Sequence, residues 1–64
     1  MPTIITTLDK NGNPIRHEAQ EDVSKAVIRV NQAVSNGHPF VAFTGPDGKE
    51  FSVQSAAVDA IREE

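Results

Sequence analysis

The chain opens with the pattern of a β-strand. Residues 3–8 are β-branched at five of six positions, which suits extended backbone. The next six residues, Asp-Lys-Asn-Gly-Asn-Pro, are rich in turn-forming types, and an Asn-Gly pair is typical of a tight hairpin. We therefore expect two strands, at about residues 3–8 and 14–18. The second is short and polar, which is typical of a strand at a sheet edge.

The apolar residues then recur about every 3.6 residues instead of every second residue, which predicts a helix over residues 19–36. The apolar side of this helix would consist of Ala19, Val23, Ala26, Val27, Val30, Ala33 and Val34. Glu18, Glu21 and Asp22 fall near its first turn, where the helix dipole favours negative charge. Gly37 is the expected left-handed residue that ends it. Because valine has a low helix propensity, packing of this apolar side must stabilise the helix.

A second hairpin is predicted over residues 40–53. Its turn, Gly-Pro-Asp-Gly, suits a type I turn whose last glycine adopts the left-handed conformation. In the register that this turn sets, Phe43 lies opposite Phe51. Val41 then lies opposite Val53, and all four side chains face the helix. A register slipped by one residue would bury the opposite face of the first strand.

Residues 55–64 have two interpretations. Ser55 can cap a helix and the alanines that follow suit one, so we expect a short C-terminal helix. The alternative is a single helical turn at residues 54–57 followed by an edge strand at 58–61. The preferred fold is thus α+β in the order ββαββα, with a small antiparallel sheet of two hairpins packed on one main helix. Residues 1–64 would form a single domain.

Composition limits what this fold can do. A chain of 64 residues buries only about 60% of the surface that its unfolded form exposes, so its stability is marginal. It has no cysteine, which excludes disulfides, and association of two copies is the expected supplement. Six basic residues against nine acidic ones make no phosphate-binding patch. The segment Met1–Leu8 lacks the pattern of a leader peptide and no apolar stretch is long enough to span a bilayer, so we expect a cytoplasmic protein.

No catalytic, cofactor-binding or metal site is predicted. His17 and His38 are far apart in the chain and lack neighbours at metal-ligand spacing. We expect His17 to be an edge-strand residue without a chemical role, and His38 to interact with the free carbonyls at the helix C-terminus. Residues 9–13 imitate the start of a calcium-binding loop. The twelfth position of that loop falls on Gln20, which cannot supply a bidentate carboxylate, so a plain hairpin turn is the better interpretation.

Three apolar side chains lie on unexpected sides of the predicted elements. Ile28 lies about 140° from Val23 around the helix axis, among polar residues. Phe40 points away from the helix in the expected register, and Ile4 and Ile5 cannot both face one side of a strand. We expect Ile4, Ile28 and Phe40 to contribute to an interface for self-association or for a protein partner.

These observations predict a non-enzymatic interaction or regulatory module that acts by protein–protein binding, as a homodimer. The alternative is a weak nucleic-acid-binding module that uses the sheet face, whose affinity would fall steeply with salt. An enzyme would need a pocket that so small a domain seldom encloses unless a dimer forms it. No small-molecule substrate or membrane partner is expected.

The segment FVAFTGPDGKEFSVQSAAVDAI, residues 40–61, resembles a pattern in very short accessory proteins of bacteriophages, especially those of actinobacteria. In these proteins a strand, an Asp-Gly turn and a second strand precede apolar residues at fixed offsets, here Val53, Val58 and Ile61. The resemblance implies expression inside a bacterial host and action by binding a host or phage protein. It assigns no functional residue.

Overall fold

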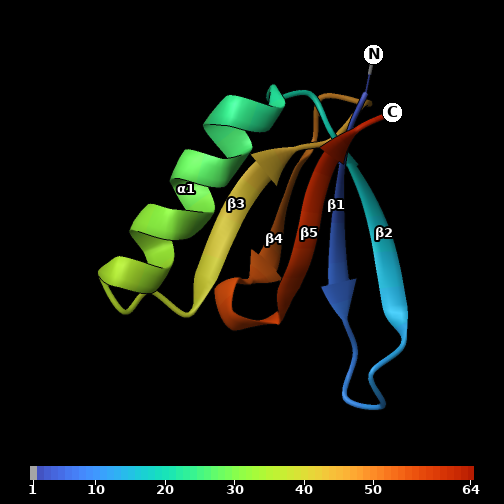
Figure 1. The fold of residues 1–64 in the computed structure, drawn as a ribbon. Coiled ribbons are helices and arrows are strands. Elements are labelled where there is room, and N and C mark those ends of the chain that lie inside the picture. Colours follow the sequence, from blue (N-terminus) through green and yellow to red (C-terminus); the bar gives the residue numbers. More distant parts are fainter. Residues whose placement is uncertain (1) are drawn as a thin grey trace.

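The computed structural model describes residues 2–64 as an α+β fold with five strands and one α-helix (Figure 1). The elements are β1 (Thr3–Leu8), β2 (Pro14–Ala19), α1 (Val23–Ser35), β3 (Phe40–Thr44), β4 (Glu50–Gln54), the 3-10 turn η1 (Ser55–Ala57) and β5 (Val58–Glu63). One sheet is three-stranded and antiparallel, in the order β2-β1-β5, and the other is the β3-β4 hairpin. Within residues 2–64, no helix combines the length and the apolar character that crossing a membrane requires.

The predicted C-terminal helix is wrong, and the alternative of a helical turn followed by an edge strand describes this segment. Ser55 is buried and fixes the turn, because its N–H donates to Pro39 O at 3.0 Å and its Oγ donates to His38 O at 2.6 Å. The chain then continues as β5, which pairs antiparallel with β1. The order of elements is therefore ββαβββ. Ladder hydrogen bonds to β1 outweigh the modest helix propensity of the alanines here.

The two hairpins also do not form one sheet on a helix. Instead, the inner face of β2-β1-β5 and the inner face of β3-β4 share a core, and α1 packs against β3 and β5. Buried core residues are Ile5, Ala19, Ala26, Ala33, Val41, Phe43 and Val53, with Val30, Phe51, Val58 and Ile61 packed against them. Phe43 is the largest side chain among those that are fully buried. The core is thus a layer between two small sheets that the helix closes along one side.

The expected register of the second hairpin is confirmed. Phe43 lies opposite Phe51 and Val41 opposite Val53, and the two phenylalanine rings have centroids 6.0 Å apart. Gly48 has φ of 83°, in the left-handed region, and its N–H donates to Gly45 O at 3.0 Å to close the turn.

The helix is shorter than the predicted range of 19–36. Asp22 caps its N-terminus by accepting a hydrogen bond from Lys25 N at 2.8 Å, and Gly37, with φ of 70°, follows its C-terminal cap as expected. Ala19 instead ends β2, opposite Thr3. The predicted helix began about one turn too early, because Ala19 fits the helical spacing of apolar residues. In the structure Ala19 belongs to β2.

The helix faces the core with its alanines rather than with all of its valines. Ala26 and Ala33 are buried and Val30 packs against the core, whereas Val27 is exposed and Val34 is 58% exposed. The prediction that both valines lie in the core is therefore wrong. Small side chains at 26 and 33 bring the helix axis close to the sheets, and at that distance the flanking valines extend past the rim of the core.

Substitution of Ala26 with leucine tests this close approach. Ala26→Leu should lower the free energy of unfolding by about 1–3 kcal/mol, because a well-packed site has no room for three more carbons. Val34→Leu, on the same helix, should change it by less than about 0.5 kcal/mol. Urea denaturation measures both, and equal effects would contradict the observed helix face.

Candidate functional site

The side of the core that α1 does not cover lies between β2 and β4. Figure 1 shows α1 at one edge of the molecule and β2 at the other. Two shallow hollows lie there, with volumes of about 360 Å³ and 260 Å³, and both are lined by residues of β2 and β4. We call these two hollows together the β2–β4 groove. It is the candidate functional site.

His17 separates the two hollows and lines both of them. Its Nε2 lies 3.0 Å from Thr7 Oγ1, and its ring stacks on Phe51 with centroids 5.6 Å apart and planes 16° from parallel. The ring therefore bridges the two sheets. His17 lies on β2, an edge strand of its sheet, as the sequence predicts.

Charged residues border the first hollow. Its lining includes the acidic residues Glu18, Asp47 and Glu50 and the basic residue Lys49, and the side chains of Glu18 and Glu50 project from the outer faces of β2 and β4. Gly45 and Pro46, from the β3-β4 turn, complete this end of the groove. An excess of negative charge in a concave surface attracts cationic groups.

The second hollow is more apolar and contains side chains that a folded chain usually covers. Leu8, Ile15, Val53 and Ala57 line it, beside the polar residues of β4. Leu8 is 40% exposed and Ile15 is 44% exposed, although both are large hydrophobic residues. Two such side chains in one hollow are a binding surface more often than scattered exposed residues are.

Within the described chain, residues 2–64, the edge of β4 that faces away from β3 has no strand partner. Gly45 N donates to Lys49 O at 2.8 Å, and Ser55 N donates to Pro39 O at 3.0 Å, in the register of the hairpin. Since hydrogen-bonded pairs alternate along an antiparallel ladder, the backbone groups of the intervening residues 50, 52 and 54 point away from β3. β4 therefore presents a row of free amide donors and carbonyl acceptors beside the groove.

The outer edge of β3, in contrast, is already satisfied. Gln20 N donates to Thr44 O at 2.8 Å, and Thr44 N donates to both carboxylate oxygens of Glu21 at 3.0 and 3.1 Å. Arg29 reaches the same edge, where its Nη1 donates to Ala42 O and to Glu21 Oε2, each at 3.0 Å. This cluster ties the end of β2 and the helix to β3 and occupies the edge of β3 at Ala42 O and at both backbone groups of Thr44.

The Glu21 carboxylate is the charged centre of that cluster. Burial raises the pKa of Glu21, but hydrogen bonds from the backbone N–H groups of Thr44 and Glu21, with the charge of Arg29, outweigh burial and lower the pKa below its ordinary value. Its side chain is only 9% exposed. The sequence predicts that Glu21 lies in the first turn of the helix, where the helix dipole stabilises its charge. In the structure Glu21 precedes the helix, and its carboxylate binds the backbone N–H of Thr44 on β3.

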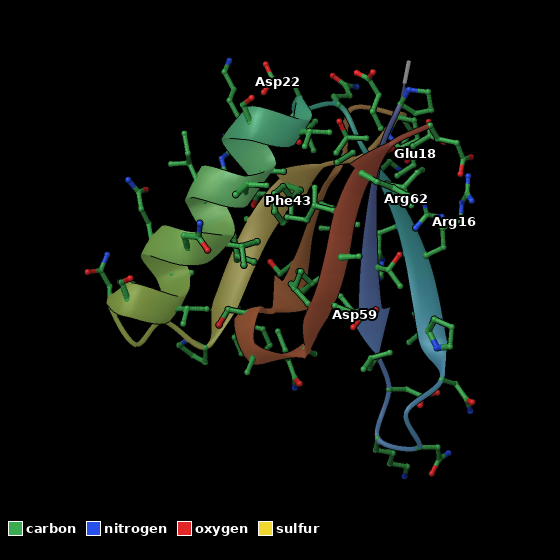
Figure 2. All side chains as sticks on the ribbon, in the orientation of Figure 1. Arg16, Glu18, Asp22, Phe43, Asp59 and Arg62 are labelled. Atoms are coloured by element: carbon green, nitrogen blue, oxygen red, sulfur yellow. The ribbon has the colours of Figure 1, made fainter. Side chains whose placement is uncertain are left out.

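Ile4, predicted as an interface residue, is fully buried and cannot be one. It faces the outer side of the three-stranded sheet, between Glu18 on β2 and Arg62 on β5. Figure 2 shows Arg16, Glu18 and Arg62 close together at this part of the sheet, and Glu64 forms ion pairs with both arginines. The aliphatic parts of these long side chains cover Ile4, while their charged ends remain in water.

The other two predicted interface residues are exposed but lie outside the groove. Ile28 is 54% exposed on α1, and Phe40 is 58% exposed at the start of β3. Leu8 and Ile15, which line the groove, were not among the predicted interface residues. The available signal was Ile15 itself, a large apolar residue in a strand that was otherwise polar.

The other residues considered as candidates for binding or catalysis stabilise a turn and the end of the helix. Asp9 Oδ1 accepts hydrogen bonds from Asn11 N and Asn13 N, both at 2.9 Å, so its carboxylate stabilises the hairpin turn. His38 is exposed, and it contributes its backbone N–H, which donates to Ala33 O at 2.8 Å, to the helix C-terminus. Across residues 2–64, no group of side chains is arranged to hold a metal ion.

Comparison with known proteins adds no family: no protein-family model, curated protein or solved structure matches this chain.

Acid titration tests the Glu21 cluster. A carboxyl whose pKa is lowered by folding stabilises the fold above its unfolded pKa, and this contribution is lost as the pH falls through the folded pKa. Glu21→Gln should therefore cost about 1 kcal/mol at neutral pH, since neutral hydrogen bonds are weaker than charge-assisted ones. The difference from wild type should narrow as the pH falls below about 4.3.

Thermal or urea unfolding at several pH values measures this convergence, with Glu50→Gln on the exposed edge of β4 as the control. Stability curves of wild type and Glu21→Gln that remain parallel down to acid pH would show that the carboxylate charge is not what holds β3.

Proposed function

We propose that this chain is a non-enzymatic module that binds other polypeptides through the β2–β4 groove. The observation that supports this proposal best is the coincidence of two features on one surface. The free backbone edge of β4 lies directly beside a hollow where Leu8 and Ile15 are exposed. A polypeptide satisfies both at once, because its backbone pairs with the edge and its side chains cover the apolar hollow.

The shape of the groove favours a polypeptide over a small substrate. Sites for small molecules are typically concave enough to bury most of their ligand. Both hollows of the groove are shallow and open to solvent along β4, and His17 divides them. An extended chain that crosses the divider buries more surface than a compact ligand in either half.

Self-association is a second part of the proposal. Ile28 and Phe40 are large, apolar and more than half exposed on α1 and β3, and a second copy is the partner that would cover them. Activity in the cytoplasm of a bacterial host, against a host or phage protein, is the setting that the resemblance of residues 40–61 to phage accessory proteins implies.

The alternative, nucleic-acid binding on a sheet face, has less support. Arg16 and Arg62 lie on the outer face of the three-stranded sheet, but both are paired with Glu64, and Glu18 lies beside them. Phosphate contacts require cationic groups that are not already neutralised.

A random-peptide display library, selected on the immobilised protein, tests groove binding. Selected peptides should bind wild type and should lose at least about tenfold in affinity to Ile15→Asp, because a charge in the apolar hollow costs well over 1.4 kcal/mol. Ile28→Asp, which is similarly exposed but lies on the helix, is the matched control and should bind normally. Failure to enrich any peptide above a blank surface would count against the proposal.

Sedimentation equilibrium tests self-association independently. The average mass of the wild type should rise with concentration, and the double variant Ile28→Ser/Phe40→Ser should remain monomeric at the same concentrations. Both side chains are largely solvent-exposed, so the fold should tolerate the changes within about 0.5 kcal/mol each. A wild type that is monomeric throughout would contradict this part of the proposal and leave groove binding to stand on its own test.

A further inference from the structure

We propose that the occupant of the β2–β4 groove is an extended, basic peptide segment that adds to the sheet as a new strand along the free edge of β4. This inference rests on the proposed function and goes beyond it, since it specifies the conformation, the pairing edge and the charge of the partner. Three observations support it: the free backbone groups of β4, the spacing of the hollows and the charge of their lining.

The backbone groups come first. Residues 50, 52 and 54 direct their amide and carbonyl groups away from β3, as the hydrogen bonds at both ends of the hairpin require. All three residues are exposed, and β4 pairs with β3 alone. On the other side of the groove, β2 is also an edge strand, but Pro14 lacks an N–H and Gln20 is already bonded to Thr44. β4 is therefore the better template for an added strand.

The groove is divided by His17 into two hollows, and this division suits the spacing of side chains on one face of a strand. Side chains on one face of a strand are about 6.8 Å apart, so successive inward side chains of a bound strand would enter on either side of the His17 and Phe51 rings. The second hollow, with Leu8, Ile15 and Val53, suits an apolar side chain. The intervening side chains of the bound strand would point outward, beside Glu50, Ser52 and Gln54 on the outer face of β4.

Charge then selects a basic partner. Acidic residues outnumber basic ones three to one among those that line the first hollow. The Glu50 side chain lies on the outer face of β4, where it would neighbour an outward side chain of the bound strand. Opposite charges on neighbouring strands stabilise pairing, whereas like charges oppose it. A second copy of this chain is a poorer occupant, because each copy has nine acidic residues against six basic ones.

A direct test uses a short peptide of alternating valine and lysine, about eight residues long. Fluorescence anisotropy should show binding to wild type, and a peptide of alternating valine and glutamate should bind several-fold more weakly, since the cross-strand contact with Glu50 becomes repulsive. Amide exchange, measured by NMR, should show protection of the Glu50, Ser52 and Gln54 N–H groups only when the valine–lysine peptide is present.

Two changes separate strand addition from simple apolar contact. Ser52→Pro removes an edge N–H that β3 does not use, and it should reduce peptide affinity at least about tenfold, whereas Ser52→Ala should bind as wild type does. N-methylation of those peptide residues whose N–H groups face β4 should abolish binding, and methylation of the alternate residues should not. The methylated peptides keep the test decisive if Ser52→Pro does not fold.

The outcomes distinguish this inference from the function on which it rests. Library peptides that bind wild type and fail on Ile15→Asp, but that are acidic or leave the β4 amides unprotected, would overturn strand addition and preserve groove binding. A second copy that occupies the groove would also overturn it, and would be seen as a dimer that persists in Ile28→Ser/Phe40→Ser but is lost in Ile15→Asp. If no peptide binds in a way that Ile15→Asp weakens, both strand addition and groove binding would be contradicted.

Discussion

The fold depends on the burial of β1 on both of its faces. β1 is the middle strand of β2-β1-β5, so each of its edges is paired, and Ile4 and Ile5 are both fully buried although they point to opposite sides. The inner face packs on the second hairpin. The outer face has no second layer, and the long charged side chains of the neighbouring strands cover it instead. This arrangement buries residues 3–7 of β1, and leaves only Leu8 of that strand exposed, without a third layer over it.

The same shortage of residues explains the groove. Two sheets packed face to face leave two open sides, and one short helix covers only one of them. The alanines of α1 let the helix approach closely, and the Glu21–Arg29–Thr44 cluster locks it against β3, so that side is closed by both packing and hydrogen bonds. On the other side, the ring of His17 stacks on Phe51 and bridges the two sheets. The unpaired edge of β4 and the exposed Leu8 and Ile15 therefore lie together on the side that α1 leaves uncovered.

Local signals in the sequence predicted those parts of the fold that local chemistry determines. The turn at Gly48 set the register of its hairpin, and Gly37 marked the end of the helix, because left-handed backbone strongly selects glycine. Residues 55–63 were less predictable, since they become a strand only through pairing with β1 at the far end of the chain. The groove was the hardest feature to predict. Exposure of Ile15 and burial of Ile4 both depend on how the two sheets pack, and neither follows from the period of a single strand.

Pairing of β1 with β5 joins segments from opposite ends of the described chain: Thr3 lies opposite Glu63, and Glu64 N donates to Pro2 O at 3.0 Å. Contacts of such long sequence separation slow folding. During synthesis, β1 emerges before β5, and its hairpin with β2 has an unprotected edge until β5 pairs with it. The nascent chain therefore passes through a period in which a β-branched strand is open to pairing with neighbouring chains, and its yield in a cell should depend on how quickly translation passes residues 58–63.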